Sequence, residues 1–151
     1  MDKKFRLPKE FAEKWLTALR SGNFHQASFK LKVTHPLGGS SYCCLGIAGE
    51  LCEMLDGYLT QNSFFRQVDI DVDITKVPKE LRGGSSQNPL VYVLTTLNDG
   101  VGTLTLKDLA TKYIIRSVNP DTVEEDLPSN NKLNFNQIAD FIEDNCELYT
   151  E

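Results

Sequence analysis

The stretch Ser40-Ser41-Tyr42-Cys43-Cys44-Leu45-Gly46-Ile47-Ala48-Gly49-Glu50-Leu51-Cys52 decides the fold of this 151-residue chain. Polar, flexible residues lead into two adjacent cysteines, and a run of small and apolar residues follows. This pattern predicts a helix over about residues 44–56 that ends at Gly57. Its inward face is expected to carry Ala48, Leu51, Cys52 and Leu55. We expect this helix to be the central element of a small α+β domain.

An alternating segment precedes the central stretch. Phe29-Lys30-Leu31-Lys32-Val33 alternates apolar and cationic residues with a period of two, which predicts a half-buried strand. Residues 34–41 contain Pro36, Gly38 and Gly39 and are expected to form a hairpin loop. Tyr42 then begins a return strand, so the sequence predicts a small antiparallel sheet.

Residues 58–75 show the same period of two. Val68, Ile70, Val72 and Ile74 alternate with Asp69, Asp71 and Asp73. Carboxylates suit hard divalent cations, but neighbours two apart on a strand are roughly 7 Å apart, and an EF-hand glycine turn is missing. We interpret the acidic residues as a solvated strand face opposite Lys30 and Lys32, and we predict no metal site.

Four further segments carry helix signals. Pro8 and Gly22 bound a helix over residues 8–21, and Asn88-Pro89 opens another that extends to Leu97. Thr105 and Asn134 begin the last two, each with a capping partner three residues later. The predicted fold is α+β, with about five helices packed on the small antiparallel sheet. A single domain over residues 1–151 is expected, with a mobile connector near residues 119–132.

Composition excludes several classes of function. The net charge of −5 argues against a general nucleic-acid binder, which usually has a basic face. The first twenty residues have no long apolar core, so no signal peptide is predicted, and no run of eighteen apolar residues is present to span a membrane. A cytoplasmic protein with reduced thiols is therefore expected. The four cysteines include no C-x-x-C pair for zinc, and we predict no cofactor.

Four short patterns occur in order along the chain. They are Trp15-x-x-Ala18-Leu19-Arg20-Ser21-Gly22-x-Phe24-x-Gln26, Tyr42-Cys43-Cys44-Leu45-Gly46-Ile47, Leu97-Asn98-Asp99-Gly100 and Phe135-x-x-Ile138-Ala139-Asp140-x-Ile142-Glu143. Together they resemble a family of small bacteriophage and prophage proteins with ALRSG-x-[YF]-x-Q, CCLG and LND…F-x-x-IAD-x-IE motifs. Here the chain departs from that pattern, because about thirty residues from Val101 to Asn134 separate the last two motifs.

The resemblance implies a setting, not a mechanism. It implies a phage accessory protein that acts in the host cytoplasm on a host-derived partner, and it transfers no catalytic residues. Small phage proteins of this kind often disable host defence enzymes or their nucleotide signals, so counter-defence is the expected role.

Donor side chains cluster early in this acidic chain. Arg20, Ser21 and Gln26 beside Phe24 would suit an anionic ligand with a base, the guanidinium taking the phosphate. The alternative is that Arg20 only complements the helix dipole. We predict a non-enzymatic protein that sequesters a nucleotide-type small molecule, with ligand-binding residues Arg20, Ser21, Phe24, Gln26, Lys30, Lys32 and Tyr42.

Two alternatives stay open at this point. The chain could instead inhibit a host defence protein by direct binding. It could also be a cysteine-dependent enzyme, because a thiolate of Cys43 or Cys44 would gain from the helix amino end and from His25 or His35 as base. Self-association is also left open.

Overall fold

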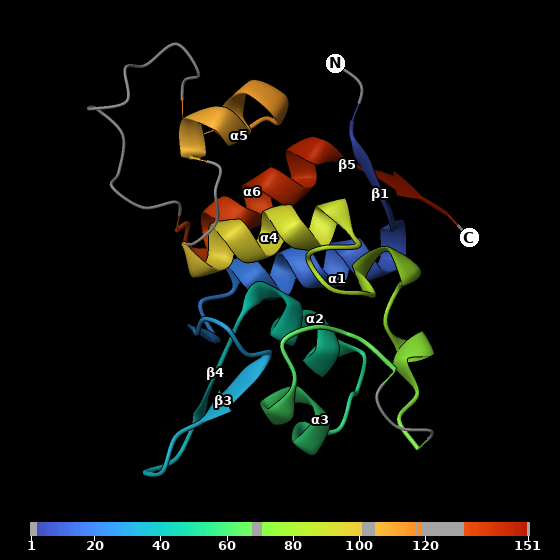
Figure 1. The fold of residues 1–151 in the computed structure, drawn as a ribbon, viewed down its shortest axis with the longest axis vertical. Coiled ribbons are helices and arrows are strands. Elements are labelled where there is room, and N and C mark those ends of the chain that lie inside the picture. The colour runs from blue at the N-terminus through green and yellow to red at the C-terminus, as the bar shows by residue number, and fades with distance from the viewer. Residues whose placement is uncertain (1–2, 68–70, 101–104, 117, 119–131, 151) are drawn as a thin grey trace.

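Four helices form the centre of the molecule in the computed structural model, which describes residues 3–67, 71–100, 105–116, 118 and 132–150. They are α1 (Lys9–Arg20), α2 (Cys44–Leu51), α4 (Pro89–Asp99) and α6 (Phe135–Asn145). Both α2 and α6 pack against α1 and α4. Figure 1 shows α6 above this pair and α2 below it. The predicted helices at 8–21, 89–97 and after Asn134 are confirmed.

The central helix is shorter and more deeply buried than predicted. Every residue from Cys44 to Gly49 is buried, so the first six residues of α2 are surrounded by protein on all sides. It ends at Leu51, Glu53 adopts a left-handed conformation with φ of 61°, and α3 (Asp56–Gln61) begins. The predicted stop at Gly57 is wrong, because Gly57 lies inside α3. The predicted inward face is also wrong at Leu51 and Leu55, which are 37% and 69% exposed.

The strands form two small sheets. One has the order β2-β4-β3, from β2 (His25–Gln26), β3 (Lys32–Thr34) and β4 (Ser40–Tyr42). The β3–β4 hairpin is antiparallel as predicted, but β2 pairs with β4 in parallel. The predicted strand over residues 29–33 is wrong before Lys32, where Phe29 has a left-handed φ of 71°, and Ser40 and Ser41, predicted as loop, belong to β4. The other sheet, which the sequence did not indicate, pairs β1 (Phe5–Pro8) with β5 (Cys146–Tyr149) in parallel. The prediction of an antiparallel sheet is therefore only partly right.

The acidic segment around residues 58–75 does not form the predicted strand where the structure describes it. Tyr58 lies in α3, and Ile74–Lys76 is a 3-10 turn, η1. The Asp73 carboxylate accepts a hydrogen bond from the Thr75 amide (3.0 Å) and caps this turn. Val68, Asp69 and Ile70 lie outside the described residues, as do residues 119–131 of the predicted connector.

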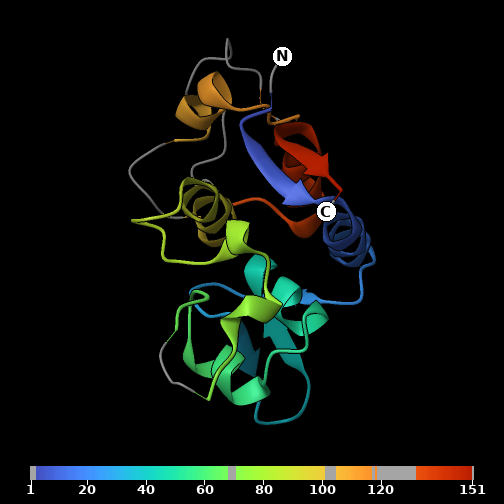
Figure 2. The ribbon, with the colours of Figure 1, turned by 90° about the vertical axis from the view of Figure 1, so that its right-hand side faces the viewer.

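Two further described elements, η2 (Lys79–Leu81) and α5 (Leu106–Lys112), lie around the four central helices (Figure 2). The turn η2 leads toward α4, and α5 lies on the far side of α6 from α1. The capping boxes predicted at Thr105 and Asn134 are both present. Among the described residues, no helix combines the length and the apolar character needed to cross a bilayer.

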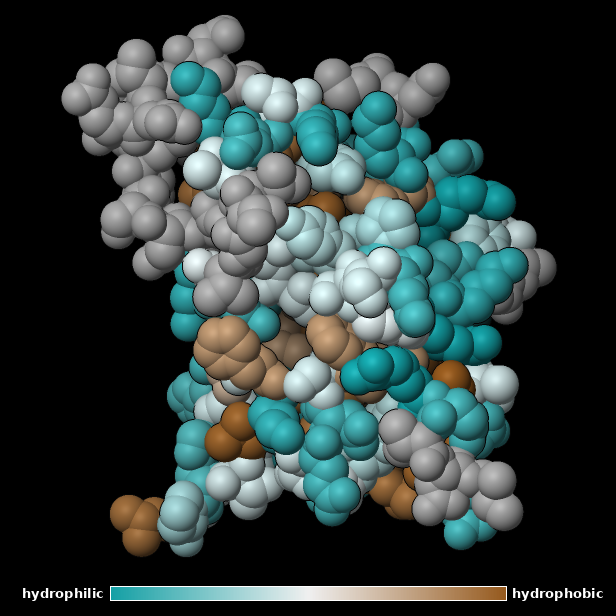
Figure 3. Space-filling view, in the orientation of Figure 1, coloured by the Kyte–Doolittle hydropathy of each residue, from teal (hydrophilic) through white to brown (hydrophobic). Residues whose placement is uncertain are grey.

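Apolar surface is concentrated in the lower part of the molecule. Four of the exposed large apolar side chains come from residues 29–55, namely Phe29, Leu37, Leu51 and Leu55. In Figure 3 brown residues are correspondingly frequent in the lower half of the face shown, and one forms the end of the β3–β4 projection. The core itself is anchored by Trp15, whose indole nitrogen donates to the Cys44 carbonyl (3.0 Å) and joins α1 to α2.

The close approach of α2 to the β3 segment depends on Gly46. A Cβ atom at this position would lie 1.6 Å from the Leu31 carbonyl oxygen, which is backbone and cannot move aside. We predict that Gly46→Ala lowers the free energy of unfolding by more than about 3 kcal/mol, because overpacking against backbone exceeds the usual core penalty. Urea denaturation followed by circular dichroism measures this change.

Gly57→Ala is the matched control. It also adds one methyl group to a helical glycine, but nothing lies within 4 Å of the new atom. Alanine is the better helix former by about 1 kcal/mol, so the control should be neutral or stabilising. Equal losses in both variants would contradict the close α2–Leu31 packing.

Candidate functional site

Three of the sequence motifs meet at the side chain of Asn98, near the end of α4. Asn98 is fully buried. Its oxygen accepts hydrogen bonds from the Gln26 amide group (3.0 Å) and the Cys44 backbone amide (3.1 Å). Its nitrogen donates to the Ala27 carbonyl (2.8 Å) and to the Asp99 carboxylate (2.9 Å). Gln26, one of the predicted ligand donors, is therefore engaged in holding the fold together.

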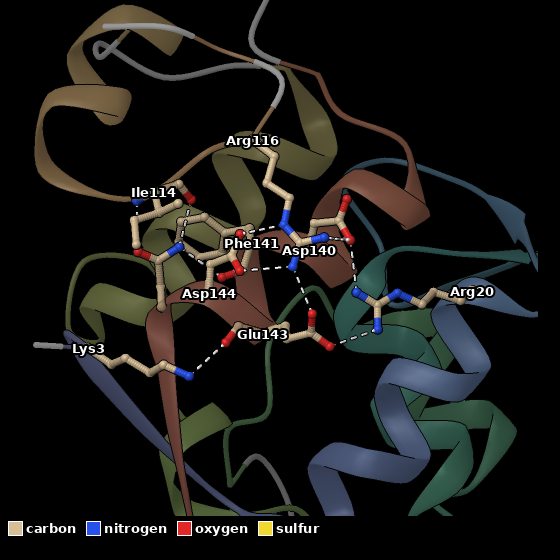
Figure 4. Close-up of polar contacts among 9 residues, drawn as sticks. Lys3, Arg20, Ile114, Arg116, Asp140, Phe141, Glu143 and Asp144 are labelled. Atoms are coloured by element: carbon tan, nitrogen blue, oxygen red, sulfur yellow. Dashed lines mark hydrogen bonds and ion pairs between the residues drawn. The ribbon is translucent and has the colours of Figure 1, made fainter. Parts of the chain in front are cut away.

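Arg20, the predicted phosphate ligand, is directed at α6. It forms ion pairs with Asp140 (2.8 Å) and Glu143 (3.2 Å), both from the last motif. Figure 4 shows Arg116, from the segment after α5, reaching the same carboxylates from the other side and also pairing with Asp144 (2.8 Å). The hydrogen bonds from Arg116 and Arg20 lower the pKa of Glu143. This charge network joins α1 and the segment after α5 to one face of α6.

The structure brings three other predicted residues together. The Phe24 and Tyr42 rings meet edge to face at 5.3 Å, and the Lys32 ammonium lies 5.4 Å from the Tyr42 ring centroid. Lys32 is buried and pairs with Asp56 (2.7 Å). It forms no ion pair with Asp71 or Asp73, the two described carboxylates of the predicted acidic strand. The hydrogen bond to Asp56 raises the pKa of Lys32.

Ser21 and Lys30 form no hydrogen bond, ion pair or ring contact with Phe24, Tyr42 or Lys32 among the described residues. The Ser21 hydroxyl donates to the Ala18 carbonyl (2.7 Å) and completes the end of α1. Lys30 is exposed and lines a small cavity beside Cys43 and Asp99. The seven predicted residues thus do not form one site: Tyr42 contacts Phe24 and Lys32, Arg20, Ser21 and Gln26 bond to other elements or to their own helix, and Lys30 is exposed.

The cysteines lack the environment of a nucleophile. The Cys43 sulfur caps α2 by accepting from the Gly46 amide (3.3 Å), and Cys44 is 1% exposed. Burial raises the pKa of the Cys43 thiol to about 12 and raises that of Cys44 well above its usual value. His35, a predicted base, contacts the Ser41 hydroxyl (2.7 Å). All four cysteines are free thiols.

A charged and aromatic cavity lies elsewhere, between β1, the start of α4 and the end of α5. Its volume is about 730 Å³, which is within the usual range for a small-molecule site. We call it the β1–α4–α5 pocket. Its lining residues come from four separate segments and are Lys4, Phe5, Arg6, Glu80, Asn88, Pro89, Leu90, Thr111, Lys112 and Tyr113.

Each wall of this pocket is fixed by contacts behind it. The Asn88 side chain accepts from the Leu90 amide (3.1 Å) and donates to the Glu80 and Arg82 carbonyls (3.0 and 2.8 Å), which joins η2 to α4. The buried Asn145 side chain bonds both the amide and the carbonyl of Ile114 (2.9 and 2.8 Å), next to Tyr113. Pairing with β5 holds β1 in place.

The pocket combines aromatic faces with cationic groups. Phe5 and Tyr113 stack with ring centroids 5.5 Å apart, and Tyr113 also packs edge to face on Phe141. Lys4, Arg6 and Lys112 surround this pair, and none of them forms an ion pair with a described carboxylate. Burial raises the pKa of the Tyr113 phenol, which therefore stays neutral at physiological pH.

Glu80 is the acidic member of the lining. One carboxylate oxygen accepts from the Tyr149 hydroxyl (2.6 Å). The other, Oε1, is buried and has no hydrogen-bond partner, and it is unique in this respect among the buried side-chain polar atoms of the described residues. A buried acceptor without a donor is costly, so Oε1 is suited to a ligand N–H or O–H. No cluster of three or more metal-ligating side chains occurs in the part of the chain that is described.

Sequence patterns gave little indication of this pocket. Asn88 and Pro89 were recognisable as a helix start, but Lys4, Arg6 and Lys112 resemble ordinary surface residues. Their proximity depends on the parallel pairing of the two chain ends, which no local pattern encodes. A lysine-aromatic-arginine triplet at residues 4–6 was the one available signal.

Thiol reactivity tests the cysteine assignment. At pH 8, a pKa near 12 leaves roughly one Cys43 in ten thousand as the reactive thiolate. We predict that iodoacetamide labels the half-buried Cys52 first, whereas Cys43, Cys44 and Cys146 react only after denaturation. Peptide mapping by mass spectrometry measures the order. Native labelling of Cys43 or Cys44 as fast as Cys52 would restore the enzyme hypothesis.

Comparison with known proteins identifies a family without assigning an activity. No curated protein and no solved structure matches the chain. A family model described as a domain of unknown function, DUF8296, matches residues 7–146. That range includes every described helix and all four sequence motifs. The chain therefore belongs to the DUF8296 family.

Proposed function

We propose that this protein binds a small aromatic anion of nucleotide type in the β1–α4–α5 pocket, without catalysing its conversion. The observation that carries the proposal is the placement of three cationic side chains around a stacked aromatic pair, in a chain whose net charge is −5. Local positive charge against an acidic background selects for an anion at this place.

The pocket supplies the three kinds of contact that a nucleotide needs. A base can stack on a ring of the half-buried Phe5–Tyr113 pair, a contact worth about 1–3 kcal/mol. Lys4, Arg6 and Lys112 can hold phosphate oxygens by charge-assisted hydrogen bonds. The first amides of α4 are already bonded to Asn88, so these side chains must supply the phosphate donors.

Binding without turnover is supported by the chemistry of the lining. The lining contains no histidine or cysteine, and Glu80 is its single carboxylate. The buried thiols with raised pKa values lie on other elements and are not part of this pocket. In the setting that the sequence resemblance implies, the ligand would be a host-derived signal, and its capture would lower the free concentration that a host defence enzyme senses.

One observation favours the alternative of binding to a host protein. Leu37 is completely exposed at the turn of the β3–β4 hairpin, and this turn is held by hydrogen bonds between His35 and Gly39 (3.0 Å) and between Gly38 and His35 (3.0 Å). It presents a single apolar contact. The pocket presents a shaped cavity with charge and stacking, so ligand binding is the function that the geometry supports best.

Titration calorimetry with AMP tests the proposal. We predict that wild-type protein binds AMP and releases it unchanged after heat denaturation, as shown by mass spectrometry. Lys4→Ala combined with Lys112→Ala should weaken binding by at least about tenfold, because two phosphate contacts of roughly 1 kcal/mol each are lost.

Lys9→Ala combined with Lys30→Ala is the matched control, because it removes the same charge from exposed sites outside the pocket. Lys30 also belongs to the sequence-predicted site. Undetectable AMP binding, or equal loss in both double variants, would contradict the assignment to this pocket.

A further inference from the structure

A second cavity adjoins the proposed site and shares one of its walls. Its volume is about 870 Å³, and it lies between the start of α1, the end of α2 and the η1–η2 segment. Glu80 lines both cavities. The second cavity is therefore a neighbouring compartment and not a distant surface hollow.

The wall between the two compartments is built from three contacting side chains. The Arg6 guanidinium lies over the Tyr149 ring at 4.5 Å from its centroid, and the Tyr149 hydroxyl donates to Glu80 at 2.6 Å. Arg6 belongs to the first compartment and Tyr149 to the second. Oε1 of Glu80 lies in this wall, buried and without a hydrogen-bond partner, so a ligand hydroxyl that reaches it would satisfy it, whereas a phosphate would be repelled.

The second compartment has its own cationic groups. Lys14 is paired with Glu10 (3.6 Å), and the Arg82 guanidinium is bonded to the Val77 and Thr75 carbonyls (2.8 and 3.2 Å). Lys76 and Lys79 line the same cavity and form no ion pair with a described carboxylate. Two lysines thus remain for an anion on this side of Glu80, opposite Lys4 and Lys112 on the other side.

We infer that the ligand is a dinucleotide whose two phosphate-bearing units occupy the two compartments. This inference rests on the proposed function of the first pocket. Each cavity alone is large enough for one small ligand, and each has its own pair of lysines. The 2′-hydroxyl of the first ribose would donate to Glu80 Oε1, and the linking phosphate would face Lys76 and Lys79. Two linked contacts raise affinity above that of either unit, because the second binds intramolecularly.

Calorimetry with AMP and with the 5′-phosphorylated diadenylate pApA tests the inference. The expected result is at least tenfold tighter binding of pApA. Lys76→Ala combined with Lys79→Ala should reduce pApA affinity to that of AMP and leave the affinity of the first pocket for AMP unchanged. Lys9→Ala combined with Lys30→Ala should preserve the preference for pApA, and circular dichroism checks that each variant is folded.

The outcomes separate the two proposals. Binding of AMP with no preference for pApA would overturn the two-compartment inference and leave the first pocket standing. A preference for pApA that survives loss of Lys76 and Lys79, or a loss of AMP binding at the first pocket in that variant, would also overturn it. Failure of both nucleotides to bind wild-type protein would overturn the proposed function itself.

Discussion

The buried side chain of Asn98 is the interaction on which the rest of the structure depends. It bonds four groups from the Gln26–Ala27 segment, the start of α2 and the end of α4, with no exposure to water. An amide in such a place is stabilising only while all its partners are present, since each orphaned buried group costs about 1–3 kcal/mol. Asn98 therefore fixes how α4, α2 and β2 meet, and that arrangement orients α1 and α6.

The residues of the sequence motifs mainly form contacts within the fold rather than a binding surface. Arg20 and Gln26 have the chemistry of ligand donors, yet they contact Asp140 and Glu143 of α6 and Asn98 of α4. Lys4 and Lys112, which form no ion pair with a described carboxylate, lie outside the motifs. The β1–α4–α5 pocket is lined by β1, η2, the start of α4 and the end of α5, and none of its lining residues belongs to the four motifs.

Local signals predicted the helices well, because caps and apolar periodicity act within a few residues. Asn88, Thr105 and Asn134 each begin a helix as their side chains indicate. The strands were harder, since the parallel pairing of residues 5–8 with 146–149 depends on long-range packing. Period-two alternation misled in the described part of residues 58–75, where the short helix α3 and the single 3-10 turn η1 form instead. The sequence identified side chains that can donate hydrogen bonds to a ligand, such as Arg20 and Gln26. It could not show that these donors are already bonded to other residues of the fold.

We propose that ligand binding is separated from the motif residues that build the fold. Titration of ¹⁵N-labelled protein with AMP, followed by amide chemical shifts, tests this most directly. The result we expect is a set of shifts confined to Phe5, Arg6, Leu90, Lys112 and Tyr113. Shifts centred instead on Ser21, Phe24, Gln26 and Tyr42 would contradict the separation and return the site to the motif residues.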